Sequence, residues 1–397
     1  MYASSFLLAF CLALGLVQAT VYSLEDDYTD DFFGNFDFFT GPDPTEGWVD
    51  FLSYDDASAS GLIKSTNPPS WGVDNNNVIS PDNSAGRPSV RLTSKKTYNQ
   101  GLFILDLAHM PHSACGVWPA FWTFSQTAQW PAGGEIDIIE YTNLGINDLM
   151  SLHTTDGCSI AGDSQYMTGE LESNVCDVSQ GSGCSINNTD STSAGTGFNK
   201  AGGGVYAMEW THELIQIWYF AAGSVPPSIT NGQPDTALFG KVTALFQGTC
   251  NIDNHFYDHA MIFDLTFCGA WAGATFGDDG CQVLSGYDSE SSCINYVGNN
   301  PHAFDNAYWT VNSLKVYKVG SNSQASSPSS GTSAVPAAST SSVGLTSQSA
   351  ALGVSTSIYA RSTSAASTTT SSATPTYSHY HHGPPSRRHA HRNQYDW

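Results

Sequence analysis

Residues 133–141 read GGEIDIIEY, and this stretch decides how the chain around it must fold. Its isoleucines favour a β-strand, yet Glu135, Asp137 and Glu140 stand among them. Side chains of a strand alternate between its two faces, so Glu135 and Asp137 share one face. Glu140 lies five residues after Glu135, and regular alternation would therefore turn its carboxylate into the core.

One extra residue in this strand would bring Glu140 back to the other acids. Burying a carboxylate without a partner costs several kcal/mol, so the regular strand is disfavoured. A β-bulge near Ile138 or Ile139 resets the alternation and turns Glu140 toward the face of Glu135. We therefore predict three acids on one surface, with two isoleucines packed inward.

Glycoside hydrolysis generally requires two carboxyl groups, one on each side of the bond that is cleaved. One attacks the anomeric carbon and the other protonates the leaving oxygen; a separation of roughly 5–5.5 Å gives retention of configuration. Asp137, between the two glutamates, can share a proton with one of them and raise the pKa of the acid. The alternatives are a calcium site or a solvated acidic edge. Calcium loops space their ligands with Asn and Gly turns rather than with isoleucines, so we expect no metal and no other cofactor.

Aromatic side chains flank the acids in the sequence. The segment GVWPAFWTFSQTAQWPAGG places Trp118, Trp122 and Trp130 within twenty residues upstream of Glu135. Trp118 and Trp122 suit a core as well as a cleft, whereas Trp130 lies in a polar loop beside the acids and suits a platform for sugar rings. His153, on the next predicted strand, is within reach of the same cleft. We take these four as candidate substrate-binding residues.

The remaining pattern indicates an all-β fold. Short apolar or alternating runs are separated by loops rich in Gly, Asn, Asp, Ser and Pro, and no segment keeps helical apolar spacing over three turns. Many short strands with turn signals between them are typical of a β-sandwich. The predicted strands are 89–93, 101–107, 120–124, 136–141, 204–210, 214–220, 260–267 and 309–318.

The N-terminus and the cysteines indicate secretion. An apolar run over residues 6–17 ends in Val-Gln-Ala, which fits a signal peptide over residues 1–19. A dozen apolar residues are short for a membrane span, so we expect none. Removing the signal leaves eight cysteines, and up to four disulfides could form in 105 different pairings. Asn187, in Asn-Asn-Thr, is the sole N-glycan acceptor and lies in a stretch that looks like a loop.

Composition divides the chain into further parts. Residues 20–319 form one block of domain size. Residues 320–376 are mostly Ser, Thr and Ala, too poor in large apolar groups for a core, and indicate a disordered stalk. Residues 377–397 form a His- and Arg-rich tail, for which a metal site is the less favoured interpretation.

Charge excludes one class of partner. Residues 1–319 hold nine Lys and Arg against 35 Asp and Glu. Binding to a phosphate backbone needs clustered Lys and Arg, so we expect no nucleic-acid partner. An acidic surface with 12% aromatic residues suits a neutral sugar polymer instead. We expect a secreted or wall-associated monomer whose partner is a β-glucan.

Taken in order, several motifs give a specific resemblance. GVWPAFW, GGEIDIIE, HTT-x2-C, GGGVYAMEWT, FCGAWAG and NAYWTVNSLKVY follow one another as in glycoside hydrolase family 16. Over about residues 25–318 the chain resembles the family's fungal secreted laminarinase-type endo-β-1,3(4)-glucanases, which carry the bulged form E-x-D-x-x-E. Relatives acting on lichenan or xyloglucan, and the fungal wall transglycosylases, resemble the shorter E-x-D-x-E form.

The resemblance implies a fold and residue roles. It implies a curved jelly-roll sandwich of the concanavalin-like kind, with glucan lying across its concave sheet. It matches Glu135 with the nucleophile, Glu140 with the acid/base and Asp137 with the helper residue. The positions of Trp122, Trp130 and His153 match residues that line the family's cleft. Ala270, in FCGAWAG, departs from the Asp expected in many relatives, at the far end of the cleft.

Two other functions stay open. A non-catalytic β-glucan-binding protein would be expected to lose one or both glutamates, and both are present here. A cell-wall transglycosylase shares the first chemical step and differs in whether a sugar hydroxyl or water accepts the glycosyl group. The Ser/Thr-rich stalk favours it mildly, and the bulged spacing disfavours it.

Overall fold

A computed structural model describes residues 22–320 of the chain. The proposed signal peptide, nearly all of the Ser/Thr-rich stalk and the whole His/Arg-rich tail lie outside these residues. Within residues 22–320, no helix has the length and the apolar character to cross a bilayer.

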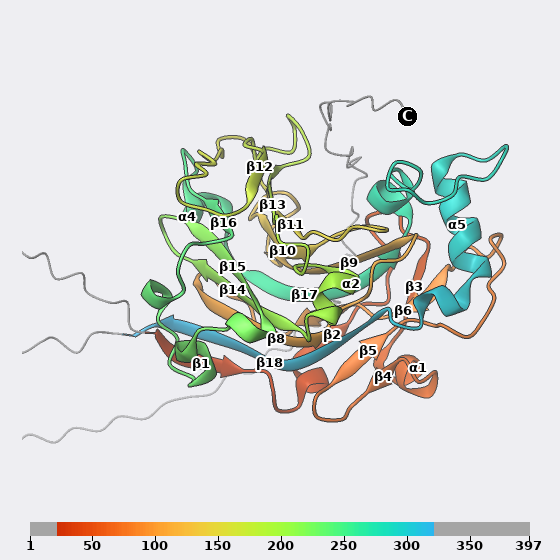
Figure 1. The fold of residues 1–397 in the computed structure, drawn as a ribbon, viewed down its shortest axis with the longest axis horizontal. Coiled ribbons are helices and arrows are strands. Elements are labelled where there is room, and N and C mark those ends of the chain that lie inside the picture. The colour runs from red at the N-terminus through yellow and green to blue at the C-terminus, as the bar shows by residue number, and fades with distance from the viewer. Residues whose placement is uncertain (1–21, 321–397) are drawn as a thin grey trace, which may run out of the picture. The chain divides into compact units, whose positions relative to one another are not determined.

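Two antiparallel sheets make up the fold, as the alternating runs predict (Figure 1). The first sheet has the order β16 (Ala244–Phe246), β15 (Ile215–Ala221), β14 (Gly204–Trp210), β8 (Gly101–His109), β18 (Tyr308–Val319), β5 (Ser70–Gly72) and β4 (Ile63–Lys64), and β1 (Tyr22–Asp27) also pairs with β18. The second sheet has the order β12 (Glu170–Ser173), β13 (Cys184–Asn187), β11 (Leu149–His153), β10 (Glu135–Glu140), β9 (Val117–Ser125), β17 (His259–Phe267), β7 (Leu92–Ser94) and β2 (Phe36–Phe38). A short parallel pair joins β3 (Val49–Phe51) to β6 (Arg87–Ser89).

Helices are few and lie in the connections. They are α1 (Tyr54–Ala59), α2 (Gly195–Lys200), α3 (Pro227–Thr230), α4 (Ile252–His255) and α5 (Ser289–Asn299). The 11-residue α5 has no counterpart among the elements predicted from the sequence. Its inward face is built largely from small residues, including Ser292 and Cys293, so apolar spacing did not reveal it. Asp288 caps its first turn by accepting the Ser291 amide at 2.7 Å.

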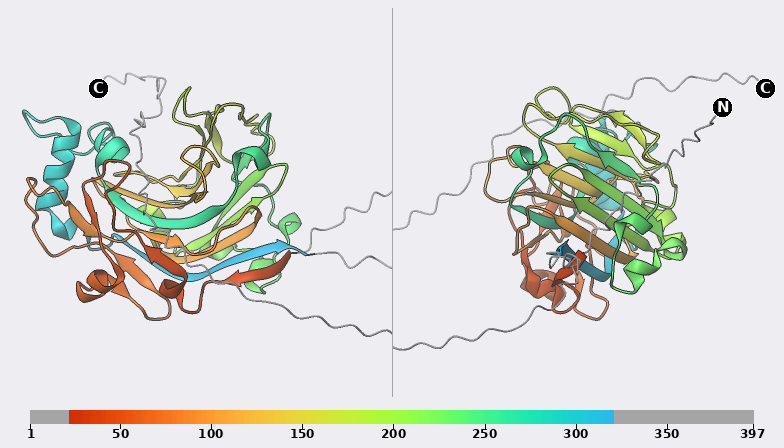
Figure 2. Two further views of the ribbon diagram at one scale, coloured as in Figure 1. Left: turned by 180° about the vertical axis from the view of Figure 1, so that it is seen from behind. Right: turned by 90° about the vertical axis from the view of Figure 1, so that its left-hand side faces the viewer.

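The sandwich core lies between the two sheets. Large buried side chains from both sheets meet there, among them Phe121, Phe263, Tyr206, Trp210 and Trp309. In Figure 2, β17 bends along its length, and its hollow side faces away from the first sheet. The second sheet therefore turns a concave face outward, and the sandwich agrees with the predicted curved jelly roll.

The predicted bulge is confirmed in β10. Asp137 pairs with Trp122 of β9, and the next paired residue is Ile139, opposite Phe121. Ile138 is thus the extra residue, and Glu140 returns to the face of Asp137. All three isoleucines of the stretch pack in the core, one more than predicted. The two consecutive inward side chains of the bulge explain the difference, since both oppose one residue of β9.

The structure establishes which cysteines pair, a question that the sequence left open. Four disulfides join Cys115 to Cys281, Cys158 to Cys250, Cys176 to Cys184, and Cys268 to Cys293. Two of them hold the loops that follow β11, and the other two hold the connection between β17 and α5. These loops flank the strands that carry the acids, so the disulfides restrain the surroundings of the concave face.

The bulge gives a first prediction about stability. Deleting Ile138 should turn Glu140 toward the core and lower the free energy of unfolding by roughly 3 kcal/mol or more, measured by denaturant titration. The control Ile138→Val keeps the residue count and should cost only about 1 kcal/mol. A deletion variant as stable as this control would contradict the role of the extra residue.

Candidate active site

Strand β10 presents three acids on the concave face. Glu135 and Glu140 are partly exposed there, with Asp137 between them at 3% exposure. Gly133 and Gly134, just before the strand, both have positive φ values, of 79° and 77°. This tight turn brings the Trp130 loop back over the start of β10.

Each of the two glutamates accepts a hydrogen bond from a tryptophan side chain. The indole Nε1–H of Trp130 donates to Oε2 of Glu135 at 2.7 Å. The Nε1–H of Trp118, on β9, donates to Oε1 of Glu140 at 2.8 Å. Trp118 is 7% exposed and packs edge-on against Trp271, with ring centroids 5.7 Å apart. Both indoles thus orient carboxylates directly, a contact that the sequence did not suggest.

His153 forms the ionic partner of the acids. It lies opposite Glu135 in the register of β10 and β11. Its Nε2 is 3.0 Å from Oδ2 of Asp137 and 3.7 Å from Oε1 of Glu135. Although burial disfavours the charged ring, the hydrogen bond and charge of Asp137, with the two glutamates, raise the pKa of His153 to about 9. The ring is therefore a cation near neutral pH.

The two glutamates differ in their electrostatic surroundings. Burial and the neighbouring Asp137 charge raise the pKa of Glu135 to about 8, against the opposing effects of His153, Trp130 and Arg91. Burial and Asp137 also raise the pKa of Glu140 well above its usual value, with the charge of Glu135 adding to them. Of the two, Glu135 has more groups that favour its ionised form, and Glu140 is the better proton carrier.

The fourth candidate, Trp122, lies one strand away from the acids. Its Nε1–H donates to Oδ2 of Asp264 at 3.3 Å, and its ring stacks on Phe124 at 5.1 Å. The Arg91 guanidinium lies 5.0 Å from the centre of the same ring and 4.7 Å from that of Phe39. Trp122 therefore belongs to a polar and aromatic cluster that adjoins the acids on the concave face, beside Asp137 in the β9 register.

Sequence reasoning missed three residues of this region. Arg91 and Asp264 are 6% and 7% exposed; burial raises the pKa of Asp264 to about 7 while Arg91 opposes the shift. Asp148, in the loop after β10, is fully buried, and its Oδ1 accepts the backbone N–H of Glu140 at 2.8 Å. It anchors the end of the bulged strand. These three residues stand in no motif. Packing of distant segments brings Arg91 and Asp264 to Trp122, whereas Asp148 contacts Glu140 from the loop that joins β10 to β11.

Glu135, Asp137 and His153 lie as close together as the ligands of a metal site do. Protonation of His153, however, favours an ion pair over metal binding. Oxygens of Glu135 and Asp137 and a nitrogen of His153 all lie within 4.8 Å of one another. These three residues could hold a divalent cation only through a neutral imidazole, because a protonated ring has no free lone pair. The raised pKa of His153 works against that form. The expectation of no metal stays a prediction.

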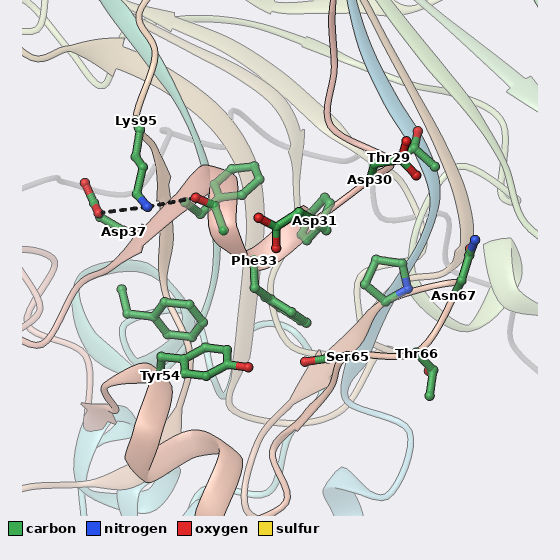
Figure 3. A pocket seen from close by; sticks show the side chains of 15 residues that line it. Thr29, Asp30, Asp31, Phe33, Asp37, Tyr54, Ser65, Thr66, Asn67 and Lys95 are labelled. Atoms are coloured by element: carbon green, nitrogen blue, oxygen red, sulfur yellow. Dashed lines mark hydrogen bonds and ion pairs between the residues drawn. The ribbon is translucent and has the colours of Figure 1, made fainter.

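A separate hollow of about 650 Å³ lies by β2, α1 and the loop before β5 (Figure 3). Phe33 and Tyr54 line it, together with the exposed side chains of Asp30 and Asp31. Lys95 pairs with Asp37 at its rim, at 3.9 Å. None of the acids of β10 lines this hollow, so it is not the candidate active site.

Known proteins resemble this chain in sequence. Residues 36–317 match the XgeA-like catalytic domain of glycoside hydrolase family 16. A probable endo-1,3(4)-beta-glucanase of Aspergillus clavatus is 45% identical over 307 residues, which cover 76% of this chain and 47% of that protein. The endo-1,3(4)-beta-glucanase xgeA of Emericella nidulans is 43% identical, over 77% of this chain and 49% of its own length. The chain thus spans about half the length of these curated relatives.

Solved structures resemble it as well. An elongating family 16 β-1,3-glucosyltransferase has 43% identity and a TM-score of 0.72, covering 75% of this chain and all of its own. Laminarinase 16A of Phanerochaete chrysosporium, solved with β-glucans in donor and acceptor sites, has 38% identity and a TM-score of 0.70 over the same shares. With the profile match covering well over half of its length, the chain belongs to glycoside hydrolase family 16.

Proposed function

We propose that this protein is a retaining endo-β-glucanase that hydrolyses β-1,3 and mixed β-1,3/1,4 glucans. The observation that carries the proposal is the bulge in β10, which puts Glu135 and Glu140 on one face with Asp137 between them. Relatives named endo-1,3(4)-beta-glucanase, at 43–45% identity, support the choice of substrate. The acidic surface and the tryptophans suit a neutral polysaccharide.

In the first step, Glu135 attacks the anomeric carbon while Glu140 gives its proton to the glycosidic oxygen. The carbon–oxygen bond breaks, and a covalent glycosyl-enzyme intermediate forms on Glu135. The Trp130 N–H and the His153 cation favour ionised Glu135 before attack. Burial and the Asp137 charge keep the proton on Glu140 until it is needed.

In the second step, Glu140 takes a proton from water, and the oxygen of that water attacks the same anomeric carbon. The bond to Glu135 breaks, and the sugar leaves with its original configuration. Asp137 acts through charge and through its ion pair with His153 at 3.0 Å, rather than by contact with the reacting atoms. The earlier expectation that it shares a proton with a glutamate remains a proposal.

Glucan transfer is the second candidate, because a relative as similar as the hydrolases is an elongating β-1,3-glucosyltransferase. In transfer, a sugar hydroxyl replaces water in the second step. Both outcomes use the same intermediate, so the bulged spacing of the acids disfavours transfer without excluding it.

We also propose that the protein is secreted and acts as a monomer. Disulfides persist in oxidising compartments, and the structure contains four of them. The apolar run at residues 6–17 adds to this argument.

Incubation with laminarin tests the function. We expect new reducing ends and shorter oligosaccharides by chromatography, with turnover falling by about 10⁴-fold in Glu135→Gln because the nucleophile is lost. The control Glu213→Gln changes an exposed glutamate far along the sequence and should be as active as the wild type. Products longer than the substrate would favour transfer, and binding without products would favour a non-catalytic glucan-binding protein.

Azide tests the stereochemistry of the second step. Glu140→Ala should be slow on laminarin, yet sodium azide should restore its turnover of an aryl β-glucoside oligomer with a good leaving group. The activated leaving group needs no acid, and azide attacks the intermediate without a base. Nuclear magnetic resonance should identify a β-glycosyl azide; an α-glycosyl azide would contradict retention.

The His153 cation gives a pH prediction. It lowers the pKa of Glu135, so His153→Ala should raise that pKa and move the acidic limb of the kcat/KM profile to higher pH. An opposite charge at this distance produces a shift of roughly one pH unit or more. The control His302→Ala removes an exposed histidine that pairs with Asp305 at the surface. Superimposable profiles for wild type and His153→Ala would contradict the role assigned to the ring.

A further inference from the structure

Asn187 lies on a strand, which corrects the expectation that it sits in a loop. It is the last residue of β13, and it pairs with Leu149 of β11 on one side and Glu170 of β12 on the other. The loop expectation failed because Ser and Gly dominate the preceding segment, whereas the ladder depends on partners from two other strands.

The side chain of Asn187 points to the concave face. The preceding Ile186 is fully buried in the sandwich core, so alternation turns Asn187 to the opposite side. Within residues 22–320 its amide makes no hydrogen bond, and it is not among the buried polar groups that lack a partner. Asn187 is half-buried, so its amide is partly open to solvent.

The register brings Asn187 into line with the acid Glu140. Asp137, Ser151 and Ser185 are opposite one another on β10, β11 and β13. Asn187 lies two residues after Ser185 in β13. Glu140 lies three residues after Asp137 in β10, but Ile138 is the extra residue of the bulge, so the advance along the strand is again two. The pairing of β10 with β11 ends at Asp137, and continuing the register from there places Asn187 and Glu140 in one row, two strand spacings or roughly 10 Å apart.

We propose that Asn187 carries an N-linked glycan that occupies one end of the concave face and limits access of long glucans. The inference rests on the proposed secretion and glucanase function. Asn-Asn-Thr is the one acceptor triplet in the sequence, and the four disulfides fit passage through the secretory pathway. A bulky, neutral sugar chain in the row of Glu140 would compete with a glucan for the same surface.

The modification is an ordinary substitution at an anomeric carbon. Nδ2 of Asn187 forms a bond to the first sugar of a lipid-linked oligosaccharide and loses one proton, and the lipid diphosphate leaves. No oxidant or reductant takes part. Thr189, two residues on, is exposed and supplies the hydroxyl that the acceptor triplet requires.

The test uses a matched pair of substitutions at Thr189 in the full chain, secreted from a yeast host. Thr189→Ala removes the acceptor triplet, and Thr189→Ser keeps it, while Asn187 is unchanged in both. Mass spectrometry before and after peptide N-glycosidase F reports occupancy directly. We expect a glycan on Asn187 in the wild type and in Thr189→Ser, and none in Thr189→Ala.

Kinetics then test the position of the glycan. The kcat/KM for long-chain laminarin divided by that for laminaritetraose should rise about threefold or more in Thr189→Ala, since distant substrate contacts contribute to transition-state binding. The ratio should stay at the wild-type value in Thr189→Ser. An unoccupied Asn187, or an unchanged ratio in Thr189→Ala, would overturn the proposal.

If the glucanase assignment is wrong, the experiments give a different set of results from those that reject the glycan proposal. No variant would then cleave laminarin, although mass spectrometry would still report the state of Asn187. The comparison between Thr189→Ala and Thr189→Ser would be made with dissociation constants for the same two glucans, from tryptophan fluorescence. Equal constants in both variants would reject the glycan as a barrier.

Discussion

The extra residue Ile138 in β10 is the constraint on which the rest of the structure depends. A regular strand cannot put carboxylates five residues apart on one face, and it would bury Glu140 in the sandwich core. The bulge moves that carboxylate outward and adds one more isoleucine to the core. The same local distortion therefore completes the site and improves the packing behind it.

Crowding three acids on one strand has an electrostatic cost that the surrounding residues offset. Each partner is specific: Trp130 donates to Glu135, Trp118 donates to Glu140, and His153 pairs with Asp137. The partners come from β9, from the loop before β10, and from β11. The asymmetry between the glutamates thus arises from neighbours and not from their own residue type.

Hydrolysis and transfer differ in what reaches the glycosyl-enzyme intermediate, and the acids alone do not decide this. In the proposed mechanism the acceptor reaches the intermediate past the elements around the acids, which include the loops held by disulfides and the adjoining cluster of Arg91, Trp122 and Asp264. A laminarinase and an elongating glucosyltransferase both resemble this chain, at 38% and 43% identity.

The sequence by itself determined the class of fold, the strand with the three acids and the bulge between them, because these follow from local alternation and residue type. It also indicated Trp130 and His153, which stand near the acids along the chain. Only the tertiary structure decided the disulfide pairing, the contact of Asp264 with Trp122, and the place of Asn187 on a strand. These depend on which distant strands become neighbours, and that choice is made by the packing of the whole sandwich, which no local pattern encodes.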